Sequence, residues 1–505
     1  MRAPSKSVSL PPPVGGWDTE NALADMPSQN AVVLDNWFPE TDKVTLRRGY
    51  SEHATGMTGS VETVVSYSPP SGSAKFFAVN DGKVYDITAP GAVTTALVTG
   101  LANDRWQDTQ IGTAGGHFLF MVNGEDTPLI YNGSTWTTAS ITGPTANNLV
   151  WCNLHQRRLW FGEINSLTAW YLPVNSISGT AAQFPMAGLA KLGGSLVAMG
   201  TWTRDGGDGT DDVAVFITSE GEAIVYAGTD PSDANLWALV GVFRIGRPIG
   251  RRCVIKAGAD LIMMTQDGFV SASSILSLDR SQTQRVALSK QINKAVNDAQ
   301  RLYRSEFGWQ PIIYPTGAML IFNIPQGGGR FHQYVFNTLT GAPCRFTGID
   351  AVSWALFGDR IFFGGTDGNV YEFDTIAGDN GDDIRADAIQ AFSYFGQPGM
   401  KKAFKLAEPL FESNGNPNAA VELNVDFQIR NTTATPAPST SLDVARWGSA
   451  RWGVSRWASA ALIFRGWRGV RGIGRAGSVR VRVATQSVRP SWISTNVTYV
   501  PGGQL

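Results

Sequence analysis

The chain has 505 residues with 41 basic and 42 acidic side chains, a formal net charge of −1, and a 43% hydrophobic fraction that supports a packed core. This length exceeds what one core usually holds, so we expect two or three domains. From three scattered Cys we expect neither a disulfide framework nor a zinc site. From the polar and Pro-rich start we expect no signal peptide, and because no run of about 18 apolar residues occurs, we expect no membrane span.

The charge is divided unevenly along the chain. Residues 446–505 contain ten Arg, no Lys and no acidic residue, which gives a net charge of +10. The remaining 31 basic and all 42 acidic residues lie in residues 1–445, which therefore carry −11. This asymmetry predicts either contact with nucleic acid or electrostatic docking on an acidic neighbour.

Residues 1–57 are predicted to form an extended N-terminal arm. Three consecutive prolines at 11–13 favour polyproline II, and further Pro and Gly exclude long helices. Four large apolar side chains interrupt this irregular region: Trp17, Trp37, Phe38 and Tyr50. Such anchors dock on the chain's own core or on a neighbouring subunit, and we take them as candidate assembly residues.

Residues 58–375 repeat one pattern, in which an apolar run enters a Gly-containing turn and a second apolar run leaves it. Asp-Gly and Asn-Gly between apolar runs are the strongest short-range hairpin signal. Five clear turns begin at Asp81, Asn123, Glu220, Asp267 and Asp367. Weaker candidates lie at 163–165 and 327–329.

The spacing of these turns indicates a repeat fold. The gaps of 42 and 47 residues match a four-stranded propeller blade of roughly 40–50 residues. The gaps of 97 and 100 are about double, and each contains one weaker candidate. Seven hairpins predict a mainly β chain with a β-propeller of six or seven blades, and the alternative is a large β-sandwich.

One stretch breaks the pattern and predicts an inserted helix near 286–303. Leu288, Ile292 and Val296 recur at helical spacing. We expect the helix itself over about 290–303, with Ser289 as a candidate cap at its start. Insertions of this kind usually lie on one rim of a propeller and often contact partners.

Residues 376–505 are predicted to form a C-terminal β domain. Residues 421–427 alternate apolar and polar side chains, as a half-buried strand does. A second strand, at 478–483, places valines on one face and Arg480 and Arg482 on the other.

Within this domain, residues 446–489 form an Arg- and Trp-rich basic segment. A five-residue repeat places an Arg-Trp pair at Arg446-Trp447, Arg451-Trp452 and Arg456-Trp457. Five residues fit neither the strand period nor the helix period, so the repeat predicts a series of turns. These pairs and the two strand arginines are interface candidates, with internal packing and DNA contact as the alternatives.

Two further motifs are weak. The acidic loop 205–212 offers Asp205, Asp208, Asp211 and Asp212 as candidate calcium ligands, but it lacks EF-hand spacing, so the alternative is a solvated loop. Residues 472–477 match a dinucleotide pattern by letter, but a strand follows where a helix is needed. We expect no cofactor and no catalytic residues, and therefore no enzyme.

The N-terminal cassette, residues 11–50, carries a family resemblance. It reads PPPVGGWD at 11–18, LADMP at 23–27, AVVLDNWFP at 31–39 and LRRGY at 46–50. The cassette resembles the opening of tail nozzle proteins of short-tailed bacteriophages, also called tail tubular protein B or packaged-DNA stabilisation proteins. The propeller repeats, the inserted helix and the C-terminal Trp-Gly repeats are similar as well, though they are less specific.

The resemblance implies a structural virion protein located in the tail and made in the host bacterial cytoplasm. It implies a homohexameric ring below the adaptor ring, which continues and closes the DNA channel and holds tail fibres or a needle. Genomic DNA would then pass through without sequence-specific binding. The alternatives are a propeller hydrolase acting on host envelope polysaccharide and a propeller that scaffolds cellular proteins.

Overall fold

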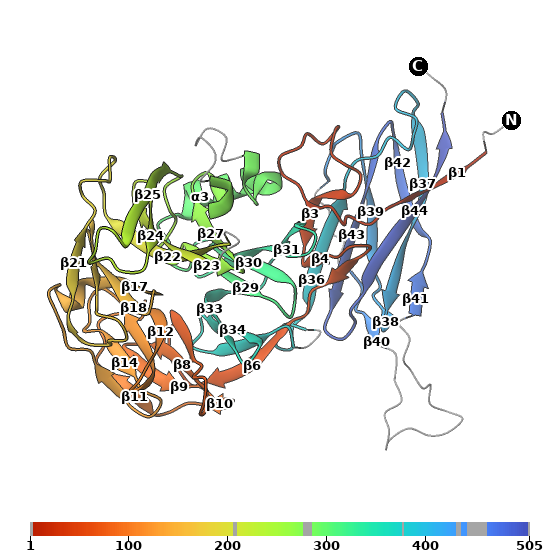
Figure 1. Cartoon of the computed structure of the whole chain (residues 1–505). Helices are drawn as coiled ribbons and strands as arrows, with labels where there is room; N and C mark the ends of the chain where they lie inside the picture. Colours follow the sequence, from red (N-terminus) through yellow and green to blue (C-terminus); the bar gives the residue numbers. More distant parts are fainter. Residues whose placement is uncertain are drawn as a thin grey trace.

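The computed structural model describes residues 4–205, 210–275, 285–375, 378–430, 436–441 and 462–502. Strands dominate these residues, and none of their helices is long and apolar enough to cross a membrane. Figure 1 shows two parts side by side, a β-propeller and a β-sandwich. The predicted mainly β class with a propeller is confirmed.

The propeller consists of sheets arranged radially around a channel. In the described residues, six of these sheets contribute four strands each, and a seventh contributes three. The first two four-stranded sheets are β7 (Thr63–Tyr67), β8 (Lys75–Asn80), β9 (Lys83–Asp86) with β11 (Ala96–Thr99), and β12 (Gln107–Thr113), β13 (Gly116–Val122), β14 (Leu129–Tyr131) with β15 (Trp136–Thr138). The next two are β17 (Leu149–His155), β18 (Arg158–Glu163), β19 (Thr168–Tyr171) with β21 (Ala182–Pro185), and β22 (Leu196–Asp205), β23 (Thr210–Thr218), β24 (Glu222–Gly228) with β25 (Trp237–Arg244). The last two are β29 (Gln310–Tyr314), β30 (Met319–Pro325), β31 (Phe331–Asn337) with β32 (Pro343–Phe346), and β33 (Ala351–Phe357), β34 (Arg360–Gly365), β35 (Val370–Phe373) with β6 (Tyr50–Thr55). The three-stranded sheet is β26 (Val254–Ala257), β27 (Asp260–Thr265) and β28 (Gly268–Ser271).

The ring is closed by a strand from the N-terminal segment. β6 precedes the propeller in sequence but pairs antiparallel with β35 of the last sheet, with Tyr50 opposite Phe373. One sheet therefore combines strands from both ends of the propeller, and radial closure protects most strand edges. The propeller also contains three short strands, β10 (Gly91–Ala92), β16 (Ile141–Thr142) and β20 (Gly179–Thr180), and one 3₁₀ turn among the described residues, η1 (Ala146–Asn148).

All seven predicted hairpins are present, and each connects the second and third strands of one sheet. In the first, Asp81 and Gly82 both have positive φ, 51° and 67°, as a tight hairpin turn requires. The two weaker candidates connect β18 to β19 and β30 to β31. The hairpin count therefore equals the number of radial sheets.

The predicted helical insertion lies between the three-stranded sheet and β29. Its described elements are α1 (Ala272–Ile275), η2 (Lys290–Ile292) and α3 (Asn293–Tyr303). Ile292 and Val296 are fully buried and form a face packed on the core, whereas Leu288, the third residue of the predicted pattern, precedes the helix and is 42% exposed. Ser289 stands at the predicted N-cap position of η2, but its hydroxyl makes no capping hydrogen bond there. The hydroxyl accepts a hydrogen bond from the Phe269 amide of β28 at 3.0 Å and donates one to Asn293 Oδ1 at 2.7 Å.

The sandwich contains two facing sheets that share one hydrophobic core with the propeller. The first sheet contains β1 (Lys6–Leu10), β4 (Trp37–Pro39), β5 (Val44–Leu46), β37 (Lys402–Ser413), β41 (Leu462–Arg465), β42 (Arg468–Gly474) and β44 (Ser491–Pro501). The second contains β2 (Gly16–Trp17), β3 (Asn30–Asp35), β36 (Ile384–Gln390), β39 (Ala420–Val425) and β43 (Gly477–Thr485). A small pair, β38 (Gly415–Asn416) and β40 (Thr440–Ser441), completes the described strands.

The prediction of one extended arm over residues 1–57 is wrong, although docking on the chain's own core, one of its two alternatives, is what the structure shows. Its strands are built into both domains, since β1, β4 and β5 belong to the sandwich and β6 to the propeller. β3 lies between β32 of the propeller and β36 of the sandwich, so one nine-stranded sheet runs from one domain into the other. We call the region where β3 contacts both domains, residues 30–50 with their partners at 343–347 and 379–390, the domain joint.

Candidate functional site

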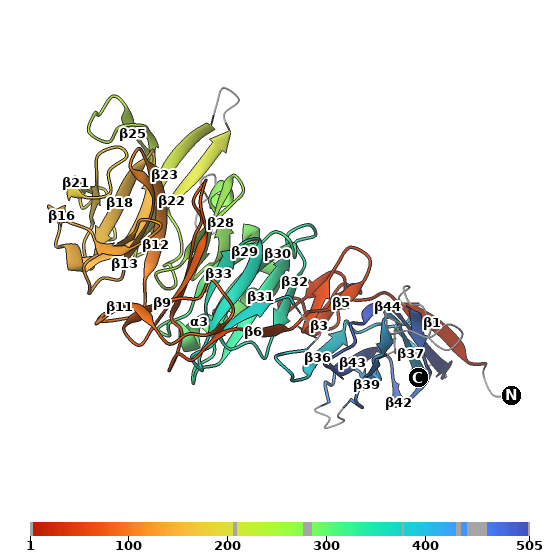
Figure 2. The same cartoon turned by 90° about the horizontal axis from the view of Figure 1, so that it is seen from below.

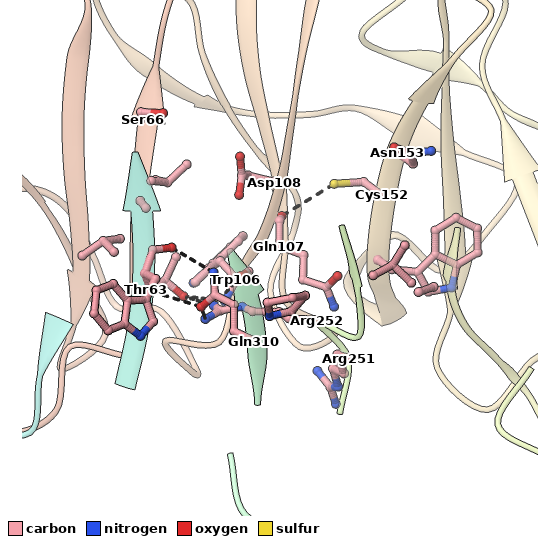
Figure 3. A pocket seen from close by; sticks show the side chains of 18 of the residues that line it. Thr63, Ser66, Trp106, Gln107, Asp108, Cys152, Asn153, Arg251, Arg252 and Gln310 are labelled. Carbon is pink, nitrogen blue, oxygen red and sulfur yellow. Dashed lines mark hydrogen bonds between the residues drawn. The ribbon is translucent and has the colours of Figure 1, made fainter. Parts of the chain in front are cut away.

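The propeller channel contains a cavity of about 360 Å³ that is lined from all seven radial sheets. Figure 3 shows a lining rich in polar side chains that point inward. These include Thr63, Ser66, Gln107, Asn153 and Gln310. The first strand of each sheet supplies the wall, so the cavity results directly from propeller closure.

Arg252 connects sheets that lie far apart in the ring. One Nη donates hydrogen bonds to the main-chain oxygens of Glu62, at 3.1 Å, and Trp106, at 2.8 Å, and to the Thr63 hydroxyl at 2.8 Å. The other reaches Gln310 Oε1 at 3.4 Å. Arg252 lies just before β26 of the three-stranded sheet, so its guanidinium connects that sheet to the sheets that begin with β7, β12 and β29. Burial lowers the pKa of Arg252 to about 10, which keeps it charged at neutral pH.

Arg251 lies at the same end of the cavity as Arg252 (Figure 3). Its Nη1 donates to the Asn123 main-chain oxygen at 3.2 Å. Burial lowers its pKa, and the nearby positive charge of Arg105 acts in the same direction. Charged side chains therefore gather at one end of the channel, and their described hydrogen bonds go mainly to backbone oxygens.

Asp108 and Cys152 also line the cavity, away from Arg251 (Figure 3). Desolvation by the surrounding protein raises the pKa of Asp108 to about 6, and the positive charge of Arg252 acts in the opposite direction. Asp108 is exposed to the cavity. Burial raises the pKa of the Cys152 thiol well above its usual range, which makes it a poor nucleophile. Among the described residues that line this cavity, Asp108 is the one carboxylate.

The raised pKa of Asp108 makes stability depend on pH. Between pH 3.8, its reference value, and about pH 6, the folded chain retains a proton that the unfolded chain releases, so stability falls as pH rises through this window. We expect Asp108→Asn to unfold at higher urea concentration than the wild type above pH 6, with the difference vanishing near pH 4. Urea unfolding at several pH values measures this. The exposed-turn variant Asp359→Asn is the control, and an Asp108→Asn difference that is constant with pH contradicts the expectation.

Three of the four aromatic residues predicted to contact a neighbouring subunit are buried in the core of this chain. Trp37 is fully buried and stacks on Phe411 at 6.3 Å, and Phe38 is also buried, with 6% exposure. Trp17 packs edge-on against Tyr334 at 5.3 Å. These three side chains are core residues of the sandwich and joint, so their assignment to a contact with a neighbouring subunit is wrong.

The fourth residue, Tyr50, is only partly buried and lies on β6 of the last propeller sheet. Its ring lies edge-on to Phe363 and to Tyr371, both at 5.1 Å. Burial raises the pKa of Tyr50 to about 12. Its described contacts are within this chain.

The strand arginines are placed as predicted, but their partners are internal. Valines and arginines of β43 alternate between core and outer face. Arg480 forms a two-pronged ion pair with Asp387, at 2.9 and 2.5 Å, and Arg482 pairs with Glu422 at 2.7 Å. Their carboxylates lie on the neighbouring strands β36 and β39, so the interface assignment of Arg480 and Arg482 is wrong.

The same face of this sheet continues the charge ladder into the propeller. Asp35 of β3 forms a two-pronged pair with Arg345 of β32, with both distances at 2.7 Å. Asp35 lies opposite Asp387 in the β3–β36 register. The ladder therefore crosses the domain joint from propeller to sandwich.

Arg47 forms the polar centre of the joint. It is 1% exposed and pairs through two nitrogens with Asp379, at 2.7 and 2.6 Å. Its Nε donates to Asn36 Oδ1 at 2.8 Å, and Nη2 donates to the Thr347 oxygen at 3.0 Å. Asn36 adopts φ 61°, a conformation that Asn tolerates better than most residues. The cassette residues Asn36 and Arg47 thus have a defined structural role.

Several predicted residues lie wholly or partly outside the described residues. Those outside are Arg446, Trp447, Arg451, Trp452, Arg456, Trp457 and Asp208. Asp205 ends β22 and Asp211 is the second residue of β23, and only their backbone is described. The Asp212 carboxylate accepts a hydrogen bond from the Thr203 hydroxyl at 2.6 Å. Across the described residues, no group of three or more potential metal ligands occurs.

No family model matches the chain, and no curated protein matches its sequence. The WD40 propeller domain of Doa1 is 14% identical with a TM-score of 0.41, over 65% of this chain and 97% of that one. BBS1N, solved in complex with ARL6DN, is 9% identical with a TM-score of 0.41, over 66% of this chain and 99% of that one. These similarities transfer no function, and the propeller assignment rests on the sheet order.

Proposed function

We propose that the chain is a structural subunit of a phage tail nozzle. In this proposal six copies form a ring below the adaptor ring of a short-tailed phage. The ring extends and closes the DNA channel, retains the packaged genome, takes part in DNA ejection and attaches fibres or a needle. The subunit is made in the host cytoplasm and resides in the virion tail.

The observation that carries the proposal is the place of the N-terminal cassette in the fold. The residues that resemble nozzle proteins supply β3 and Arg47, which join the two domains. Domains connected by a linker move relative to each other by default, unless their interface is large and apolar. Here a continuous sheet and one shared core hold them together. A rigid two-domain subunit suits the wall of a channel that holds DNA under pressure.

The charge distribution supports the same role. Residues 1–445 carry a net charge of −11, and like charge repels the phosphate backbone. In the proposed ring, subunits with this net charge repel DNA and favour its passage over its binding. Among the described basic residues of 446–505, Arg480 and Arg482 pair with carboxylates of this chain, whereas the exposed Arg465, Arg468 and Arg471 suit contacts with acidic protein surfaces.

A genetic experiment tests this function. In the phage that encodes this chain, interrupting its gene is expected to give particles that lack the distal part of the tail and lose their packaged DNA. Supplying the wild-type chain in trans restores both. Complete tails and full infectivity in the absence of the chain contradict the proposal.

A further inference from the structure

Two exposed apolar strand edges lie at opposite ends of the molecule. One is β25, the outermost strand of its propeller sheet; the other is formed by β41 and β42, which both pair with β37 of the sandwich. Figures 1 and 2 place β25 at the far end of the propeller from the sandwich strand β42. In the described part of the chain, no strand pairs with the outer side of either edge.

The sandwich edge, residues 462–475, is apolar and basic. Its exposed apolar side chains are Leu462 at 46%, Ile463 at 55%, Trp467 at 45% and Ile473 at 74%. The same stretch contains no acidic residue and four arginines: Arg465, Arg468, Arg471 and Arg475. We call this surface the basic edge.

The propeller edge is apolar and acidic. Leu236, Leu239 and Val240 are 51%, 43% and 41% exposed. The loop that leads into β25 carries Asp230 and Asp233, and Asp230 already pairs with Arg158 at 3.0 Å.

One further described carboxylate, that of Asp212 on β23, lies at the same end of this sheet. Because neighbouring strands are antiparallel, the start of β23 and the start of β25 lie at the same end, with β24 between them. We call β25 with its leading loop and Asp212 the acidic edge.

We propose that the acidic edge of one copy docks on the basic edge of a second copy of the same chain. Both surfaces combine exposed apolar side chains with charge: arginines on the basic edge, and aspartates at the start of β25 on the acidic edge, with Arg244 at the other end of β25. Exposed apolar edges are otherwise hazards that proteins cover or charge. Because the two edges differ, the contact is heterologous, and its repetition gives a ring when the rotation closes.

The physical contributions to this contact differ in kind. Leu239 and Ile463 supply apolar area, and unpaired backbone groups of the edge strands can add hydrogen bonds across the contact. The aspartates and arginines mainly set orientation and association rate, so the contact weakens with salt. This inference rests on the proposed ring-forming function and assigns the surfaces that would build the ring.

Cross-linking between copies tests the pairing. Leu239→Cys chains are mixed with Ile463→Cys chains and treated with a short bismaleimide, and the wild type, with its native cysteines, gives the background. The proposal predicts a mixed 239–463 product, identified by mass spectrometry of the linked peptides. It predicts no comparable yield from either variant alone.

A charge swap adds a matched control. Arg468→Glu is expected to raise the midpoint concentration for assembly by about tenfold or more, and Asp233→Arg in the same chain is expected to recover part of the loss. Lys6→Glu makes the same charge change on β1 of the same sheet and leaves assembly unchanged.

The outcomes separate this inference from the proposed function. A mixed cross-link together with the Arg468→Glu loss supports the docking. Rings or functional tails with no 239–463 product overturn the docking and leave the nozzle function standing. A chain that stays monomeric at high concentration and low salt, and also fails to join tails, overturns both.

Discussion

Replacing Arg47 with Met is expected to destabilise the chain by about 3–5 kcal/mol, because it leaves the buried Asp379 carboxylate without its counter-charge. Both side chains are inaccessible, at 1% and 7% exposure, and they share two short hydrogen bonds. Arg47 also holds Asn36 and the Thr347 carbonyl, so the loss includes the polar centre of the domain joint. Urea unfolding followed by tryptophan fluorescence measures the free energy of unfolding.

Two further variants make this expectation specific. Arg360→Met breaks the exposed pair with Glu372 and is expected to cost less than about 1 kcal/mol. The double variant Arg47→Met with Asp379→Leu removes both charges and is expected to recover most of the loss. Equal costs for Arg47→Met and Arg360→Met would show that the buried pair does not hold the joint together.

Replacing Arg252 with Met is expected to cost about 2–4 kcal/mol. The variant leaves the carbonyl oxygens of Glu62 and Trp106 without the hydrogen bonds that Arg252 donates. It also removes the connection between the three-stranded sheet and the opposite side of the ring. Hydrogen exchange is expected to rise in β7, β12 and β26, because fewer contacts then hold the inner strands.

The neighbouring arginine is the matched control. Arg251→Met removes a side chain of the same type at the adjacent position, with one described hydrogen bond to Asn123. We expect it to cost less than about 1 kcal/mol and to leave exchange in β7 unchanged. If both variants cost the same, the connection through Arg252 contributes nothing special to propeller closure.

The propeller could be predicted because its signal is local. A tight hairpin needs positive φ within two residues, so Asp81-Gly82 and its counterparts reveal the turn wherever they occur. The repeat spacing then requires no knowledge of long-range pairing. The weaker 163–165 and 327–329 candidates lack Asp-Gly or Asn-Gly, yet each marks a sheet of its own.

The N-terminal segment could not be placed, because its strand partners are far away in sequence. Asp35 pairs with residues 310 and 352 positions later, at Arg345 and Asp387. No local period reports such pairing, and proline-rich sequence between short strands resembles a free arm. Large aromatics indicate burial, but they do not say whether the core belongs to this chain or to a neighbour.

The channel residues were missed for a similar reason. Arg251 and Arg252 stand just before an inner strand, and that doublet is the one sequence signal for them. Asp108 is an isolated acid whose neighbours come from other sheets. The Arg480 and Arg482 face was found, but the sequence does not show that Asp387 and Glu422 lie on the flanking strands.

Projection images of the purified wild-type chain by electron microscopy test the central claim most directly. At low ionic strength and high concentration, we expect closed rings with six-fold symmetry, in which the acidic edge of each copy meets the basic edge of the next. The same images in high salt are expected to show fewer rings, because the charged contribution is screened. A monodisperse field of single two-domain particles under all these conditions would contradict a ring-forming nozzle subunit.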